Sequence, residues 1–276
     1  MKYITSKDNP YYKELVKLAS SARQRNKEGK TLLDGAHLLA AYLESGHQPV
    51  HIIVTDAAQH DPEIKSLLQK LPEVPVTQLD DGLFAGLSEL KSLSGVIAQI
   101  AVTHPAAIHP DKQVQDSQFC LLLENIQDPG NLGSMLRSAA AAGCDAVFMS
   151  KGCADVWSPK VLRAAMGGHF VLNLYEKADL LSVASHFSGK LFAAALSDGS
   201  SLYDSLLTGR IAFVIGNEGA GLTQPLLAKA ISVTIPMLGK VESLNAAAAA
   251  AICLFEAVRQ RSKIIKIQGD VNTLID

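Results

Sequence analysis

The sequence predicts an α/β protein with two domains, of which the C-terminal one contains a parallel sheet. From residue 119 onward, short and continuous apolar runs alternate with segments of helical period, a pattern typical of a parallel sheet that helices cover on both faces. Before that point, residues 103–118 interrupt the alternation. The chain has 276 residues, of which 48% are hydrophobic, and this is enough to bury two cores.

Residues 1–102 are expected to form the smaller α/β domain. Apolar positions at helical spacing predict a helix over 11–22. The further elements expected here are a strand at 31–35, a helix that ends before Gly46, a β-branched strand at 50–55, mixed elements over 64–90, and a last strand at 95–102. A unit of this size is able to fold independently.

Residues 103–118 are expected to be a linker and residues 119–276 the larger domain. The linker contains two prolines and two histidines, has neither helical nor strand period, and offers no third ligand for a metal ion. The strands expected after it lie at 119–125, 145–150, 170–175, 190–196, 211–216 and 231–236, and the last helix covers about 244–261. Ligands bind at the carboxyl ends of parallel strands, so chemistry is expected in the loops that follow Leu123, Leu196, Ile215 and Ile235.

The composition excludes several classes of protein. The formal net charge of −2 argues against a protein covered in positive charge, although residues 23–30 form a local basic segment that equally fits a solvated helix end. The four cysteines are scattered without a CxxC pair, which indicates neither a zinc site nor a disulfide framework and fits a reducing cytoplasm. Neither a signal peptide nor a membrane span is recognisable. A soluble cytoplasmic protein without a metal is expected.

The first loop, which follows Leu123, contains Asn131 where the helix N-cap is expected, and Arg137 six residues later in the second turn. Taken singly, the two residues also fit a cap and a surface cation. The second loop contains Gly216, Glu218 and two further glycines, which allow a backbone to approach a ligand closely. It matches neither the dinucleotide nor the triphosphate fingerprint, and Glu218 also fits an exposed acid.

The third loop, 235–245, ends at a run of six alanines that favours a closely packed helix. Either Ser243 or Asn245 is a candidate N-cap of this helix. A buried helix explains the alanines but not the polar loop ahead of them.

Together and in this order, the three loops resemble the motifs of the SpoU (TrmH-type) family of SPOUT-class RNA ribose 2'-O-methyltransferases. The resemblance is clearest over residues 119–260, and residues 1–100 more weakly resemble the family's ribosomal-protein-like substrate-binding domain. It implies a deep trefoil knot in the C-terminal domain, a homodimer formed through the knotted domains, and S-adenosyl-L-methionine as cofactor. The residues that it assigns to the cofactor site are Leu196, Gly216, Asn217, Gly219, Ile235, Met237 and Leu244.

The resemblance also assigns five catalytic positions, which are Asn131 and Arg137 in the first motif, Glu218 in the second, and Ser243 and Asn245 in the third. The 2'-hydroxyl attacks the sulfonium methyl in line and must lose its proton. Family proposals give this proton to Arg137, but guanidinium groups are ordinarily locked in their protonated form, so stabilisation of the developing alkoxide ranks at least as high. One departure from the family lies at residues 164–169, which leaves the subgroup of substrates open.

RNA is the expected partner, with phosphates near Arg23, Arg25, Lys27, Lys160 and Arg163, and ribosomal RNA is favoured by analogy. Aromatic residues are 5% of the chain, so recognition by shape and backbone is expected. Methylation of transfer RNA, a catalytically silent RNA-binding protein on the same fold, and a dinucleotide-dependent oxidoreductase are the alternatives. None of the three loops contains a histidine that would activate a serine nucleophile, which argues against a hydrolase.

Overall fold

A computed structural model describes residues 1–88, 90, 94–102, 114–196 and 199–272, and its contacts divide the chain into two compact units. Unit 1 comprises Met1–His104 and Asp155–Val171, and unit 2 comprises Pro105–Ala154 and Leu172–Asp276. Most of the expected linker, residues 103–113, lies outside the described residues. The segment Asp155–Val171 groups with unit 1, although it lies between two strands of the unit 2 sheet in the sequence.

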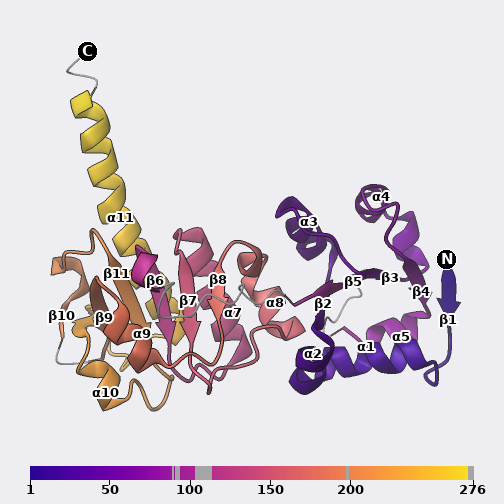
Figure 1. The fold of residues 1–276 in the computed structure, drawn as a ribbon, viewed down its shortest axis with the longest axis horizontal. Coiled ribbons are helices and arrows are strands. Elements are labelled where there is room, and N and C mark those ends of the chain that lie inside the picture. Colours follow the sequence, from indigo (N-terminus) through magenta and orange to yellow (C-terminus); the bar gives the residue numbers. More distant parts are fainter. Residues whose placement is uncertain (89, 91–93, 103–113, 197–198, 273–276) are drawn as a thin grey trace. The chain divides into compact units, whose positions relative to one another are not determined.

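Unit 1 is a five-stranded mixed sheet with helices on both faces (Figure 1). The strand order is β1-β4-β3-β5-β2; the first three are parallel, and β5 is antiparallel to both of its neighbours. The strands are β1 (Lys2–Ile4), β2 (Lys30–Asp34), β3 (His51–Val54), β4 (Val76–Leu79) and β5 (Val96–Ala101). The helices are α1 (Pro10–Ser20), α2 (Ala22–Glu28), α3 (Ala36–Glu44), the 3-10 turn η1 (Ala57–His60), α4 (Pro62–Gln69) and α5 (Asp81–Ala85).

The single helix expected over 11–22 is two helices. Ser21 has an extended backbone that ends α1, and its hydroxyl accepts a hydrogen bond from the backbone N–H of Gln24, which caps α2. Gly29, at φ 61°, then ends α2 in the left-handed conformation. Leu15, Leu18 and other apolar side chains of α1 pack with those of α5 against one face of the sheet. Gly29 connects α2 directly to the start of β2.

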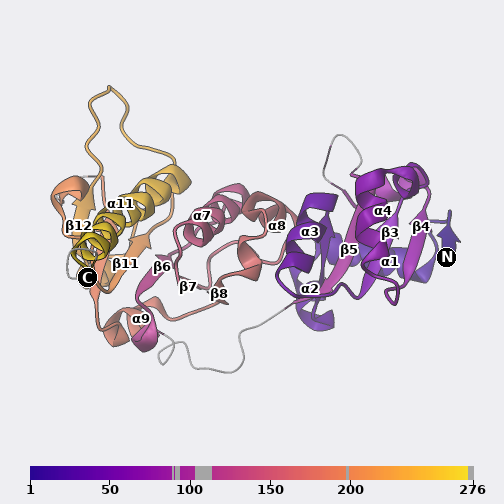
Figure 2. The same ribbon diagram turned by 90° about the horizontal axis from the view of Figure 1, so that it is seen from above.

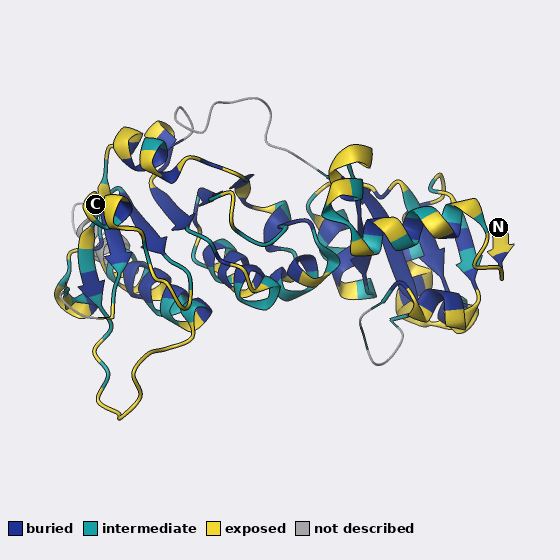
Figure 3. Cartoon of the chain, turned by 90° about the horizontal axis from the view of Figure 1, so that it is seen from below, coloured by how far each residue is buried: buried dark blue, intermediate teal, exposed yellow. Residues whose placement is uncertain are grey.

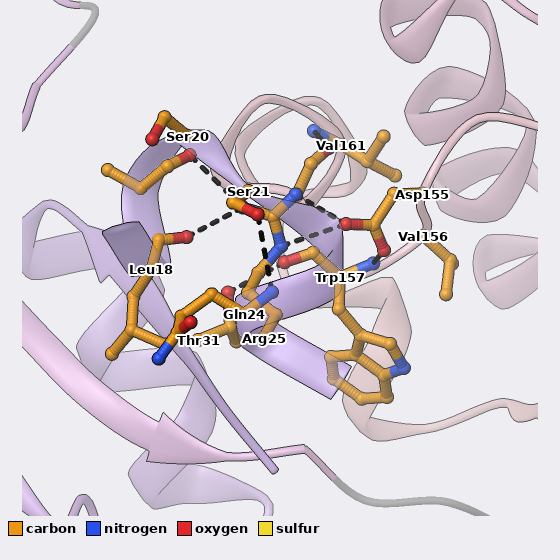
Figure 4. Close-up of polar contacts among 12 residues, drawn as sticks. Leu18, Ser20, Ser21, Gln24, Arg25, Thr31, Asp155, Val156, Trp157 and Val161 are labelled. Carbon is orange, nitrogen blue, oxygen red and sulfur yellow. Dashed lines mark hydrogen bonds and ion pairs between the residues drawn. The ribbon is translucent and has the colours of Figure 1, made fainter. Parts of the chain in front are cut away.

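The segment that unit 1 takes from the second half of the chain contains α8 (Pro159–Ala165) and the 3-10 turn η2 (Gly168–Phe170). Helix α8 packs against β2. Arg25 of α2 contacts Asp155 through Nε at 2.8 Å and also through Nη2, and its Nη1 donates to the carbonyl of Leu18 at 2.6 Å (Figure 4). The Thr31 hydroxyl donates to the carbonyl of Trp157 at 2.6 Å. These contacts hold the segment on unit 1.

Unit 2 is a seven-stranded sheet in the order β10-β12-β9-β11-β6-β7-β8, and all of its pairings are parallel. The strands are β6 (Phe119–Leu123), β7 (Ala146–Met149), β8 (Asn173–Tyr175), β9 (Lys190–Ala194), β10 (Ser200–Ser201), β11 (Ile211–Ile215) and β12 (Ile231–Thr234). The helices are α7 (Pro129–Ala141), α9 (Leu180–His186), the 3-10 turn η3 (Leu202–Asp204), α10 (Gln224–Leu227) and α11 (Ala246–Asn272). The α/β class and the parallel C-terminal sheet are therefore confirmed.

The central strands of unit 2 are buried along their whole length (Figure 3). One face packs against α9 and α10 through a cluster that includes Phe148, Tyr175 and Phe187. On the other face, α11 packs against α7 and β11. The loop between β12 and α11 extends away from the sheet and is exposed (Figure 2; Figure 3). No helix within the described part of the chain is long and apolar enough to cross a membrane.

Candidate active site

The start of α7 differs from the sequence prediction. The N-cap is Asp128, whose carboxylate accepts from the backbone N–H of Asn131 at 2.7 Å, and Pro129 occupies the first helical position. Asn131 is therefore not the cap but the third residue of the helix. Because Asp128 supplies the cap, the side chain of Asn131 is free to bind other groups.

A chain of hydrogen bonds joins the three loops. Asn131 Nδ2 donates to Glu218 Oε1 at 2.8 Å, and Asn131 Oδ1 accepts from Asn245 Nδ2 at 2.8 Å. The Asn245 Oδ1 accepts from the backbone N–H groups of Ala247 and Ala248, so Asn245 caps α11. Of the two candidate caps in the third loop, the structure selects Asn245. Three of the five expected catalytic residues meet at one place.

Which group donates and which accepts in these hydrogen bonds follows from the groups at the two ends of the series. An ionised carboxylate only accepts hydrogen bonds, so Asn131 presents its amide N–H2 to Glu218. The helix N-terminus only donates, so Asn245 presents its oxygen to α11 and its N–H2 to Asn131. Both amide orientations are thereby determined, which leaves one arrangement for all three side chains.

The other two expected catalytic residues are exposed. Arg137 lies on the solvent side of α7, whose buried residues include Leu132, Met135 and Leu136. Its guanidinium makes no hydrogen bond or ion pair with any of the described residues, so its donors are available to a substrate. Ser243 is exposed two residues before the Asn245 cap. The structure brings neither side chain into the hydrogen-bonded chain.

The second loop is a compact turn organised by Asn217. Asn217 Oδ1 accepts from the backbone N–H groups of Gly219 and Ala220, each at 2.9 Å, and its backbone pairs with that of Gly221. A Cβ on Gly216 would lie 2.4 Å from the carbonyl carbon of Gly221, so only glycine fits there. Gly221 itself has φ 68°. Glu218 is thus presented at the tip of an ordered turn.

A pocket in unit 2 lies next to this chain of hydrogen bonds. It is partly open to solvent, and its cavity volume is about 60 Å³. It is lined by Ala194, Ala195, Leu196, Val233, Ile235, Met237, Leu244 and Ala249. Leu244 directly precedes Asn245, so the pocket and the polar chain share a stretch of backbone. All of the lining side chains are apolar, so polar contacts with a ligand in this pocket would come from backbone groups.

Four of the seven residues expected at the cofactor line this pocket, namely Leu196, Ile235, Met237 and Leu244. The other three, Gly216, Asn217 and Gly219, belong to the second loop and are not part of the lining. The side chain of Asn217 is occupied in ordering its own turn and in donating to the carbonyl of Asn125 at 2.9 Å. Any contact of Asn217 with a ligand therefore falls to its backbone.

The expected RNA contacts all belong to unit 1, and one of them needs correction. Arg25 is 4% exposed and is bound to Asp155, Leu18 and Ala19, so it is not available to a phosphate. Its neighbours Arg23 and Lys27 on α2 are exposed, as is Lys160 on α8, and Arg163 is half-buried. Arg25 has a structural role, because it joins α2, which carries Arg23 and Lys27, to the segment that carries Lys160 and Arg163.

Sequence reasoning missed three residues that shape the site. Glu124, Asn125 and Thr223 connect the first and second loops through hydrogen bonds. The signal was the polar pair Glu124-Asn125 directly after a fully apolar strand. Within the described residues, no three His, Cys, Asp or Glu side chains form a group able to hold a metal ion.

Comparison with known proteins agrees with this geometry. Residues 118–255 match the SpoU rRNA Methylase family, and residues 9–98 match an MRM3-like substrate binding domain. The chain is 32% identical to the 23S rRNA (guanosine(2553)-2'-O)-methyltransferase RlmP of Bacillus subtilis, over 92% of this chain and 98% of that protein.

Solved structures show the same fold. A crystal structure of an RNA 2'-O ribose methyltransferase superposes with a TM-score of 0.81 at 29% identity, covering 94% of this chain and 98% of that one. The methyltransferase AviRb of Streptomyces viridochromogenes, in complex with the cofactor AdoMet, superposes with a TM-score of 0.79 at 24% identity, covering 92% and 100%. The chain belongs to the SpoU rRNA methylase family.

Proposed function

We propose that the chain transfers a methyl group from S-adenosyl-L-methionine to a ribose 2'-hydroxyl of ribosomal RNA. The observation that carries the proposal is the series of hydrogen bonds Glu218–Asn131–Asn245, which joins three loops beside an apolar pocket. The family and the relative RlmP support the reaction and the choice of ribosomal RNA.

Leu196, Ile235, Met237 and Leu244 would bind the cofactor through apolar contact and neighbouring backbone groups. The cofactor supplies an electrophilic methyl on a sulfonium ion. The protein has to place the 2'-oxygen in line with that methyl, and correct placement alone provides much of the acceleration in such reactions. Glu218, Asn131 and Asn245 keep the loops in register, and Ser243 contributes by hydrogen bonding.

Arg137 is the group that acts on the attacking oxygen. Its guanidinium is exposed and unpartnered among the described residues, and such groups stay protonated in proteins. A protonated guanidinium stabilises the alkoxide that develops as the hydroxyl passes its proton to solvent water. This role is favoured over direct removal of the proton by Arg137.

RNA binds through the phosphates that Arg23, Lys27, Lys160 and Arg163 contact in unit 1.

The protein acts as a cytoplasmic homodimer with the deep knot of its family. Exposed apolar side chains of unit 2, among them Leu238, Val241 and Phe255, support self-association. Sedimentation of the purified protein tests the proposed dimer, and a monomer at micromolar concentration contradicts the dimer.

The reaction is tested with labelled S-adenosyl-L-methionine and total RNA from a strain that lacks the protein. We expect label in ribosomal RNA, at an internucleotide linkage that resists alkali. Label confined to transfer RNA overturns the choice of substrate. Binding of the cofactor by calorimetry without any transfer of label indicates the silent RNA-binding alternative, and binding of NAD in its place indicates an oxidoreductase.

A further inference from the structure

The two residues that follow β6 bind the second loop at both of its ends. The Glu124 carboxylate accepts two hydrogen bonds from Thr223, to Oε2 from the backbone N–H at 2.8 Å and to Oε1 from the hydroxyl at 2.9 Å. The carbonyl of Asn125 accepts from Asn217 Nδ2 at 2.9 Å. The turn that carries Glu218 is therefore held between Asn217 and Thr223.

Asn125 has a left-handed backbone conformation, with φ 55°, which is uncommon outside glycine. Its backbone N–H donates to Ser150 Oγ at 2.9 Å, and its Oδ1 accepts from the same hydroxyl at 3.3 Å. Gly152 leaves the room for it, because a Cβ there would lie 1.9 Å from Asn125 Oδ1. The surroundings thus hold Asn125 in a conformation that asparagine tolerates better than most other residues.

The turn transmits these restraints to Glu218. Asn217 Oδ1 orders the backbone of Gly219 and Ala220, and the backbones of Asn217 and Gly221 pair with each other. Glu218 lies inside this turn and accepts from Asn131 at 2.8 Å. A shift of the turn relative to β6 would therefore displace the Glu218 carboxylate relative to α7.

We propose that Glu124 and Asn125 are positioning residues for methyl transfer, which fix the turn 217–223 and through it the contact between Glu218 and Asn131. This proposal rests on the proposed function. The Glu124–Thr223 contact is exposed and contributes little to the stability of the fold. A displacement of about 1 Å at a reacting site, by contrast, is able to lower the rate by about 100-fold.

The test compares Glu124→Ala with Glu124→Gln. The alanine variant removes both acceptors, and we expect kcat to fall by about 10- to 100-fold while the melting temperature changes by only a few degrees. A glutamine oxygen still accepts from the Thr223 N–H, and its N–H2 donates to the Thr223 hydroxyl. Glu124→Gln therefore recovers most of the activity. Gln127→Ala, at an exposed position of the same loop, is the control and retains wild-type kcat.

A second pair of variants tests whether Glu124 acts through Thr223. Thr223→Val removes the hydroxyl and Thr223→Ser retains it, so only the valine variant should lose activity. Residues that act through one contact are not additive, and the double variant Glu124→Ala/Thr223→Val should lose little more than Glu124→Ala alone. Full additivity, or wild-type kcat in Glu124→Ala, overturns the proposal.

Amide hydrogen exchange separates this proposal from the proposed function, because it requires no RNA. In Glu124→Ala the backbone amides of Gly219 and Ala220 should exchange about 10-fold faster than in the wild type. If they exchange at the wild-type rate, the positioning role is wrong whatever the activity. If exchange accelerates but the wild-type protein methylates no RNA, the proposed function fails while the restraint on the turn stands.

Discussion

The side-chain amide of Asn131 donates to the carboxylate of Glu218, with 2.8 Å between Nδ2 and Oε1, across 87 residues of sequence. Backbone features secure both side chains, since Asn131 lies in the first turn of α7 and Glu218 in the turn that Asn217 orders. The same amide accepts from Asn245, which caps α11. The relative position of the three loops is thus determined before any ligand binds, as catalysis by preorganised groups requires.

Replacement of Glu218 tests this relationship. Glu218→Ala removes the charged acceptor of the Asn131 N–H2, so the second loop is no longer held against α7, and a small displacement at a reacting site is able to lower the rate by about 100-fold. We expect kcat/KM to fall by about 10- to 100-fold, measured by transfer of labelled methyl groups to RNA. Glu218→Gln keeps an acceptor oxygen and should lose less. Glu242→Ala removes another exposed glutamate from the third loop and is the control. Equal losses in Glu218→Ala and Glu242→Ala would contradict the role of Glu218.

Arg137→Ala should abolish methyl transfer and leave cofactor binding intact. The side chain is exposed on α7 and alanine is the better helix former, so stability should change by less than about 0.5 kcal/mol. Arg137→Lys keeps the charge but not the planar fork, and it should recover only part of the rate. Calorimetry measures the affinity for the cofactor, and transfer of labelled methyl groups measures the rate of the reaction. Normal turnover by Arg137→Ala would show that the guanidinium has no part in the reaction.

The sequence predicted that the loops after β6, β11 and β12 lie together, as the structure shows, but not how their side chains bind one another. Glycine-rich and polar loops after apolar strands were sufficient for the first prediction, and the match to the SpoU family confirms the resemblance. The N-cap of α7 was misassigned because Asp128 and Asn131 are both good caps, and Pro129 at the first helical position was the signal that distinguishes them. The hydrogen bonds between loops depend on tertiary register, which no local pattern encodes.

Arg25 shows the same limit in unit 1. Its spacing with Arg23 and Lys27 is typical of an exposed basic segment, and the partner that buries it, Asp155, lies 130 residues away. The packing of residues 155–171 on unit 1 likewise depends on contacts with β2 that alternation of strands and helices does not reveal.

Arg25→Met should destabilise unit 1 by about 2–4 kcal/mol, because the half-buried Asp155 carboxylate loses its partner. Trp157 is the only tryptophan of the chain and lies buried next to this ion pair, so its fluorescence during urea unfolding reports on unit 1. Arg23→Met, at an exposed position of the same helix, should change stability by less than about 0.5 kcal/mol. Similar unfolding midpoints for the two variants would rule out a structural role of Arg25.

Lys160→Ala should weaken binding to ribosomal RNA and reduce its dependence on salt. Each phosphate contact contributes close to one unit to the slope of log K against log salt concentration, so the loss of one contact should lower the slope by about 1. Lys65→Ala, also exposed in unit 1 but on α4, is the matched control. A filter-binding titration at several salt concentrations measures both variants. The same slope for Lys160→Ala as for the wild type would place the RNA elsewhere.

Acid should destabilise unit 1 through His169. This residue is buried, its Nε2 lies 2.7 Å from the carbonyl of Val156, and its Nδ1 has no partner among the described residues. Burial lowers the pKa of His169 to about 4, against about 6.5 for an unfolded chain. Between these values the unfolded state binds the additional proton, so stability should fall as the pH is lowered from 6.5 to 4, by up to about 1.4 kcal/mol per pH unit. The glutamine of His169→Gln still donates to Val156, and this variant should reduce the dependence of the free energy of unfolding on pH. His60→Gln, at an exposed site, should leave that dependence unchanged. Urea unfolding followed by Trp157 fluorescence measures both variants. A slope that is the same in both variants would assign the acid sensitivity to other groups.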